Sequence, residues 1–134
     1  MEKKDIRLKS DSGSIRESSS RILKDLENYN IGDKAAFEIK LCVEEAVRNA
    51  IVHGNKSDSK RLVRIIYWVE EGALNIEIED EGSGFDHRSV KDPTKEENLL
   101  RNSGRGVYLI KKLMDKVEYN EKGNKISMSK KIRR

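Results

Sequence analysis

The sequence predicts an α/β fold, a two-layer sandwich in which helices cover one face of a mostly antiparallel mixed β-sheet. Some segments repeat apolar residues with the helical period, while others alternate in polarity and come in pairs around short turns. Strands joined by hairpins pair antiparallel, so the helices are left to one face. The expected order is β-α-α-β-β, a long loop, then α-β-β.

The amino-terminal segments predict a strand and a helix. Residues 5–9, DIRLK, alternate in polarity and predict a short strand. The next segment, SIRE, fits a capping box, with Ser14 as the N-cap and Glu17 reaching back to it. The helix that follows is expected to run to about Tyr29. Its apolar side would consist of Ile15, Ile22, Leu23 and Leu26.

The carboxyl-terminal half predicts two hairpins around a helix. Residues 61–80 alternate in polarity and turn at Glu71-Gly72, and residues 116–132 form a second hairpin. A helix is expected over residues 104–115. Residues 81–103 have little periodicity, and so long a loop in a small domain is more often a functional lid than slack.

The composition fits one folded domain, because the chain has 134 residues and its 35% hydrophobic residues are grouped with clear periods. The net charge of +4 is mild and both signs are interspersed, which favours solubility more than nucleic-acid binding. A single cysteine, with no signal core and no apolar run of membrane length, predicts a cytoplasmic protein. The terminal basic cluster is expected to be a solvated tail, with a partner or nucleic-acid contact as the alternative. This cluster consists of Lys130, Lys131, Arg133 and Arg134.

The second predicted helix begins at Asp33, its expected N-cap, and runs to about His53, where Gly54 is a natural stop. One broad face of this helix is apolar and is expected to pack on the sheet. That face consists of Ile39, Val43, Ala46, Val47 and Ala50. A second sector is expected to be solvated, with a weak ion pair between Glu44 and Arg48.

Glu45 and Asn49 lie in neither sector, and apolar residues border them on the helix. A carboxylate and an amide in such a place lose water and need polar partners. The partners are either hydrogen bonds within the fold or the contents of a polar pocket. In a pocket, Asn49 would offer its oxygen to a hard cation, and Glu45 would accept a hydrogen bond from a water or hydroxyl. His53 is expected at the helix end or the pocket rim.

Asp80 continues the apolar face of the strand that precedes it, because the alternation of Leu74, Ile76 and Ile78 points it to the same side. An aspartate there is costly unless it is paired. Gly82 and Gly84 follow, and glycines permit an unusual turn and the close approach of a ligand. Asp80 therefore either caps local amides or accepts a hydrogen bond from the exocyclic amine of a planar ligand.

Gly104 and Gly106 begin the last predicted helix, with Arg105 between them. Free backbone N–H groups and the positive end of the helix dipole make such a start an anion site. The alternative is an ordinary glycine-rich helix entry. The spacing matches neither a P-loop nor a dinucleotide-binding fingerprint.

Together the three motifs, EEAVRNAIVHG, IEDEGSGFD and SGRGVYLIKKLMD, resemble the GHKL family of ATP-binding proteins. The branch they are most similar to is that of the anti-sigma factor serine kinases, and the resemblance runs from about Ile6 to Ile132. It implies the Bergerat-type ATPase fold in a single domain over residues 1–134, with an ATP lid at about residues 87–103.

The resemblance implies a role for each matching residue. Asp80 would recognise the adenine amino group, and Gly82 and Gly84 would shape the adenine and ribose pocket. Asn49 would be the protein's own ligand to Mg²⁺, and Glu45 would take the proton from the attacking hydroxyl. The other ATP-binding residues would be His53, Ser103, Gly104, Arg105, Gly106 and Val107.

A lid arginine that stabilises charge on the transferring phosphate is expected close before the first glycine of the last motif. Arg101 and Arg105 are the two candidates in this chain.

The function implied by the resemblance is that of an ATP- and Mg²⁺-dependent protein-serine kinase that acts as an anti-sigma factor. It would sequester a sigma factor and phosphorylate a serine of a STAS-type antagonist, whose added charge would block docking. Direct contact with nucleic acid or membrane is not expected, and the resemblance is compatible with a homodimer. The main alternative is a module of the same fold that controls a partner by nucleotide-dependent binding. A histidine-kinase catalytic domain and a plain structural or nucleic-acid-binding domain are the further alternatives.

Overall fold

The computed structural model of the chain describes residues 1–82 and 102–132, and the side chains of residues 102–105 are outside the description. The observed order of elements is the predicted one. The helices and strands are β1 (Lys4–Lys9), α1 (Gly13–Asp25), α2 (Asp33–Asn49), β2 (Leu62–Glu70), β3 (Ala73–Glu79), α3 (Asn102–Leu113), β4 (Lys116–Tyr119) and β5 (Lys125–Lys131). A short 3₁₀ turn (Glu27–Tyr29) follows α1, and a π-helical turn (Ala50–Gly54) extends α2.

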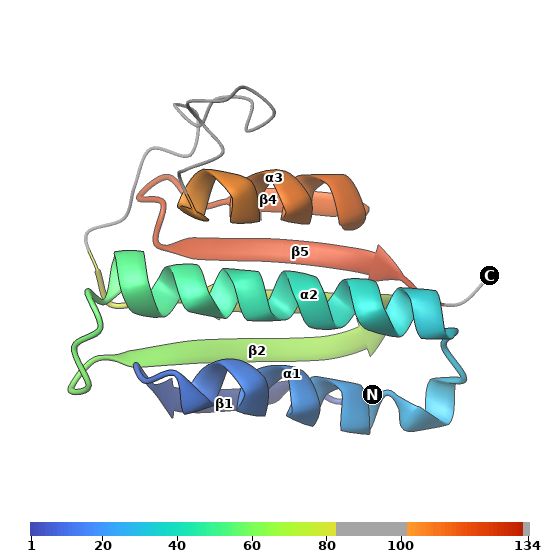
Figure 1. Cartoon of the computed structure of the whole chain (residues 1–134). Coiled ribbons are helices and arrows are strands. Elements are labelled where there is room, and N and C mark those ends of the chain that lie inside the picture. Colours follow the sequence, from blue (N-terminus) through green and yellow to red (C-terminus); the bar gives the residue numbers. More distant parts are fainter. Residues whose placement is uncertain (83–101, 133–134) are drawn as a thin grey trace.

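The strands form one sheet in the order β1-β2-β3-β5-β4. The helices lie together on one face of it, with α2 between α1 and α3 (Figure 1). The two-layer sandwich is therefore confirmed. Every pairing between the strands of residues 1–82 and 102–132 is antiparallel, so the parallel pairing that a mixed sheet would contain is not found in these ranges.

The core lies between the sheet and the helices. The apolar face predicted for α2 is buried there, since the exposed fraction is 0% for Ile39, Val43 and Val47. Alternate residues of the central strands meet it from the other side: Val63, Ile65, Tyr67, Leu74, Ile76 and Ile78. Each large apolar side chain buried in this way contributes about 1.5–3 kcal/mol to folding.

The predicted hairpin turn is confirmed at Glu71 and Gly72, which have φ angles of 51° and 78°. Two successive positive φ angles are typical of the tight turns whose twist matches that of antiparallel strands.

The helix starts differ from the predicted ones. Helix α1 begins at Gly13, and the carboxylate of Asp11 accepts hydrogen bonds from the Ser14 N–H at 3.1 Å and from its hydroxyl at 3.2 Å. Ser14 is thus inside the helix, and the predicted capping box with Glu17 is wrong. A carboxylate is a stronger acceptor than a hydroxyl and is favoured by the positive end of the helix. Asp33 is the first residue of α2, after Gly32 as the N-cap, and makes no capping bond.

The carboxyl-terminal basic cluster is not wholly a solvated tail. Lys130 lies in β5, where its Nζ donates a hydrogen bond to the Leu113 carbonyl at 2.8 Å and lies 3.5 Å from Glu38 Oε1. Its side chain is 12% exposed. Lys130 therefore ties the sheet to α2 and α3, and the prediction of a solvated tail is wrong for this residue.

Within residues 1–82 and 102–132, none of the helices combines the length and the apolar character that crossing a membrane requires. The cytoplasmic location stays a prediction, as does the division into a single domain.

Candidate functional site

A cavity of about 260 Å³ opens where the end of α2, the end of β3, helix α3 and the β4–β5 turn meet. Its floor is apolar, and several polar side chains converge on it, as is typical of small-molecule sites. The apolar lining consists of Ala46, Ala50, Ile78, Val107, Ile110 and Ile126. The polar lining consists of Asn49, His53, Lys56, Asp80, Tyr119, Asn124 and Lys125. Residues from all three sequence motifs therefore line one cavity.

Asp80 is half-buried directly after β3 and faces the cavity, as the alternation of the strand predicted. Its Oδ1 accepts a hydrogen bond from the Gly82 N–H at 2.8 Å. Burial raises the pKa of the Asp80 carboxyl above its usual range, and the Gly82 hydrogen bond opposes that rise. One oxygen of Asp80 thus caps the local turn while the residue lines the cavity, so both predicted roles are compatible.

Gly54 lies against Asp80, and this contact explains the glycine. A Cβ built on Gly54 would lie 2.6 Å from Asp80 Oδ1 and closer still to Oδ2, which real carbon atoms do not tolerate. Gly54 does end the helical segment, but its φ is not positive, so a left-handed stop is not what requires glycine. Gly82 is equally confined, because its Cβ would overlap the Gly54 carbonyl.

Gly106 brings the start of α3 onto the acid–amide pair of α2. A Cβ on Gly106 would lie 2.9 Å from Glu45 Oε2 and 3.1 Å from Asn49 Nδ2. The glycine therefore allows the close approach of the two helices at this point. The first and third motifs, which are far apart in the sequence, are in direct contact.

Glu45 forms an ion pair with Arg48, which was predicted to pair with Glu44. The Arg48 guanidinium donates to Glu45 Oε1 at 2.6 Å. Glu44 instead accepts a hydrogen bond from the buried Ser19 hydroxyl at 2.6 Å. The expected Glu44–Arg48 pair is therefore wrong. Helix geometry lets Arg48 reach either glutamate, and the contact with α1 decides between them.

The remaining predicted residues divide into three groups. His53 is exposed at the rim of the cavity, as expected, and Val107 is buried in its wall. Gly84 and Arg101 lie outside the described residues, and so does the predicted lid except for its last residues, 102 and 103. Helix α3 begins at Asn102, two residues before the predicted start, so Ser103, Gly104 and Arg105 lie in its first turn. The side chains of Ser103 and Arg105 are not described.

Two asparagines that the sequence did not single out hold the Asp80 segment. Asn124 donates from Nδ2 to the Asp80 carbonyl at 3.0 Å, and the Asp80 N–H donates to the Asn124 carbonyl at 2.9 Å. Asn55 is fully buried and accepts a hydrogen bond from the Glu81 N–H at 2.7 Å. In the sequence both are ordinary turn residues, and only their long-range contacts distinguish them.

Tyr119 adds a phenol to the cavity wall. Burial raises the pKa of Tyr119 to about 12, so the phenol is neutral at physiological pH.

The described residues fit a magnesium ion that arrives with a nucleotide and takes few ligands from the protein. In the described part of the chain no group of three or more His, Cys, Asp or Glu side chains is placed to hold a metal ion. Mg²⁺ bound with nucleotide takes most of its ligands from phosphates and waters, so it needs few from the protein. Asn49 lines the cavity and is able to supply one amide oxygen.

Residues 8–130 of the chain match the family described as the histidine kinase-like ATPase domain. The chain belongs to this family. The acid–amide pair on α2, the Asp80 motif after β3 and the glycines at the start of α3 are the features by which the sequence resembled the GHKL family.

Curated relatives of this histidine kinase-like domain include the serine-protein kinase RsbW of Staphylococcus aureus strain Newman, with 37% identity over 105 residues. The match covers 72% of this chain and 66% of the relative, and RsbW of strain USA300 gives the same values. The chain thus spans just under two thirds of the length of these relatives. The similarity confirms the resemblance to the serine kinase branch.

A solved structure supports the fold. The crystal structure of the RsbU and RsbW domains of Rv1364c from Mycobacterium tuberculosis matches with a TM-score of 0.66. The match covers 96% of this chain and 31% of that chain, at 14% sequence identity. At this identity the similarity shows the fold alone.

Proposed function

We propose that this domain is a protein-serine kinase that binds Mg²⁺-ATP in the cavity and acts as an anti-sigma factor. The observation that carries the proposal is the convergence of Asn49, Asp80 and Val107 on one cavity from three separate segments. Glu45 and Gly106 do not line the cavity, but they meet each other beside Asn49. The partners would be a sigma factor, which it sequesters, and a STAS-type antagonist, which it phosphorylates on serine. The chain would act as one domain in the cytoplasm.

The Asp80 side of the cavity is suited to an adenine ring. Asp80 Oδ1 accepts from Gly82, while Oδ2 has no hydrogen bond from any described residue and faces the Gly54 backbone. A carboxylate oxygen in this place is an acceptor for the adenine 6-amino group. The apolar floor of Ala50 and Ile78 would cover the faces of the ring.

The Gly106 side of the cavity is suited to phosphates. The start of α3 offers backbone N–H groups without helical partners, and its dipole favours negative charge. Asn49 would hold Mg²⁺ through its side-chain oxygen. Mg²⁺ bound there would neutralise part of the charge on the phosphates.

Phosphoryl transfer requires a base for the serine hydroxyl, and Glu45 would take this role. Glu45 would accept the hydroxyl proton as the serine oxygen bonds to the γ-phosphorus and the bond to the β–γ bridging oxygen breaks, so that ADP leaves. Arg48 would orient the carboxylate through its 2.6 Å contact with Oε1. The phosphoserine would carry roughly two negative charges and so weaken docking of the antagonist.

A second candidate function is nucleotide-dependent control of a partner without phosphoryl transfer. The Arg48–Glu45 pair favours it, because one oxygen of the glutamate is already engaged.

The two functions separate in one pair of experiments. Calorimetry with Mg²⁺-ATP tests binding, and incubation with labelled ATP and a STAS-type antagonist tests transfer. Heat of binding with label on the antagonist is the expected result. Heat without any label would favour the second candidate, and no heat at all would contradict both.

A further inference from the structure

We infer that Asn55 is a positioning residue that sets the selectivity of the cavity for a base with an exocyclic amine. It would act through the turn that carries Asp80, and so the inference rests on the proposed role of Asp80 in nucleotide binding. Asn55 itself does not line the cavity.

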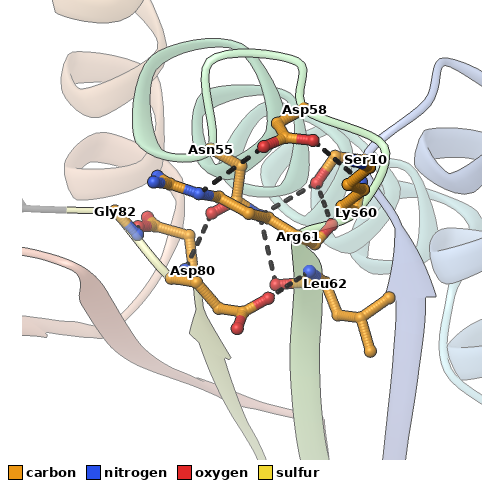
Figure 2. Close-up of polar contacts among 9 residues, drawn as sticks. Ser10, Asn55, Asp58, Lys60, Arg61, Leu62, Asp80 and Gly82 are labelled. Carbon is orange, nitrogen blue, oxygen red and sulfur yellow. Dashed lines mark hydrogen bonds and ion pairs between the residues drawn. The ribbon is translucent and has the colours of Figure 1, made fainter.

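The side chain of Asn55 is fully engaged. Its exposed fraction is 0%, and its Nδ2 donates to Ser10 Oγ at 2.9 Å and to the Leu62 carbonyl at 3.1 Å. Its Oδ1 accepts from the Glu81 N–H at 2.7 Å. Figure 2 shows Asn55 in the middle of this network, between Ser10, Leu62 and the segment of Asp80 and Gly82. One amide thus joins the chain beyond β1, the start of β2 and the chain beyond β3.

The bond to Glu81 fixes the turn on which Asp80 stands. The Glu81 N–H belongs to the peptide that directly follows Asp80, so the bond restrains that peptide plane. Gly82 donates to Asp80 Oδ1 one residue further on. Asn124 holds the Asp80 backbone from the opposite side. The carboxylate therefore has little freedom to rotate while Asn55 is in place.

The position of Asn55 in the sequence couples the turn to the cavity wall. Asn55 directly follows Gly54, whose backbone touches the Asp80 carboxylate and leaves no room for a Cβ at Gly82. A shift of Asn55 would move Gly54, and with it the wall against which Asp80 is set. Asn55 thus controls both the carboxylate and the surface that it faces.

The backbone after Asn55 is strained, which shows how strongly this region is held. Lys56 and Ser57 have φ angles of 54° and 56°, a conformation that L-residues other than glycine adopt rarely. Such residues persist where surrounding contacts over-determine them, and they cluster at functional sites. The contacts here are the Asn55 side chain and two backbone bonds of 2.8 Å, from Asn55 N–H to Ala50 and from Ser57 N–H to Ile51. Lys56, on this strained turn, lines the cavity.

A purely structural role for Asn55 makes a different prediction from a positioning role. If Asn55 has only a structural role, its loss would lower the stability of the domain and reduce the affinity for all nucleotides by the same factor. If Asn55 is a positioning residue, its loss would mainly reduce the affinity for the ligand whose recognition depends on the direction of the Asp80 carboxylate.

The test compares the affinities of ATP and purine riboside triphosphate, which lacks the 6-amino group, by calorimetry. A hydrogen bond from a ligand amine to a charged carboxylate predicts about a tenfold or greater preference of the wild-type domain for ATP. In Asn55→Ala we expect this preference to fall to about twofold or less, while the affinity for the analogue changes less than that for ATP. Ser10→Ala is the matched control, because it removes one partner of Asn55 and leaves the Glu81 bond. It should lower the melting temperature and keep the preference.

Each outcome decides between the proposals. If Asn55→Ala keeps the wild-type preference for ATP over the analogue, the positioning role is overturned. The same holds if Ser10→Ala loses as much of this preference as Asn55→Ala does. Binding of neither nucleotide by the wild-type domain would instead overturn the proposed function. If Asn55→Ala does not fold, Asn55→Ser keeps a polar group in the buried site, and the same ratio applies: a preserved preference overturns the inference and a lost one supports it.

Discussion

The two ends of the cavity are built in different ways. At the proposed adenine end, Gly54 and Asp80 line the cavity. Asn55 and Gly82, which do not line it, fix the geometry there through hydrogen bonds and close glycine contacts. At the proposed phosphate end, Asn49 lines the cavity and Glu45 and Gly106 lie beside it, and the described contacts are the Arg48–Glu45 ion pair and the close approach of Gly106. The adenine end is therefore set by folding itself, whereas the phosphate end depends on how α3 docks on α2. Substitutions should accordingly affect binding at the first end and rate at the second.

The largest effect is expected at the phosphate end, from Glu45→Gln. Loss of a general base lowers transfer by about 10²–10⁴-fold, while ATP binding should change little. Transfer of label from ATP to a STAS-type antagonist measures the first, and calorimetry the second. Glu44→Gln is the matched control, since the neighbouring glutamate bonds to Ser19 of α1 instead. Equal losses in both variants would show that Glu45 is not the base.

Gly54→Ala should break the adenine end. The new Cβ would collide with the Asp80 carboxylate. Overpacking of this kind costs about 1–3 kcal/mol, so we expect ATP affinity to fall by about 10–100-fold. Gly32→Ala is the control, because nothing lies within 4 Å of its Cβ position. If Gly54→Ala binds ATP as well as Gly32→Ala does, the tight contact with Asp80 is not needed for binding.

Gly106→Ala, at the proposed phosphate end, should have a smaller effect than Gly54→Ala. Its Cβ would meet the tips of the Glu45 and Asn49 side chains, which are able to shift, rather than a fixed backbone. We expect transfer to fall up to about tenfold through misplacement of Glu45. Stability should hold or rise, since alanine is favoured over glycine in a helix by about 1 kcal/mol. Gly13→Ala, at the start of α1, is the comparison, because its Cβ would meet only Asp11 Oδ1, at 3.4 Å. A loss of stability in Gly106→Ala would contradict this reading of the contact.

The smallest effect concerns the stability of Asp80→Asn. Burial raises the folded-state pKa of Asp80 above its unfolded value, so the folded protein holds the proton more tightly. The resulting stabilisation is present below the unfolded pKa and is lost as pH rises through the folded pKa. Asparagine does not titrate. In urea unfolding, the variant should therefore gain stability relative to the wild-type domain as pH rises from the unfolded pKa of Asp80 to its folded pKa, while it loses ATP binding. A constant difference across that range would contradict the burial of the charge.

Features that depend on local periodicity were predictable from the sequence. The alternation of β3 placed Asp80 on the cavity side, and the helical wheel gave the buried face of α2. The turn at Glu71-Gly72 followed from its residue types. In each case the information lies within a few residues of the feature.

Features that depend on contacts between distant segments were not predictable. On an isolated helix Arg48 is three residues from Glu45 and four from Glu44, so both pairs are possible. In the fold, Arg48 pairs with Glu45, while Glu44 bonds to Ser19 of α1 and lies 3.8 Å from Lys40. Gly54 has the composition of a helix stop, and its true constraint is the Asp80 carboxylate. In the sequence Asn55 resembles any polar loop residue, and only the fold shows that it bonds to segments next to three strand ends. These choices need the tertiary fold, which a single sequence does not display.

The strand order has a consequence for synthesis on the ribosome. Strand β5, the last of the described strands in the chain, lies inside the sheet between β3 and β4. Asn124, in the turn before it, supports the Asp80 backbone. A nascent chain that has emerged only as far as β4 would expose β3 as an open edge and have an unfinished nucleotide site. Cellular ATP would therefore protect only chains translated through Lys131, and truncated fragments would be left to proteases.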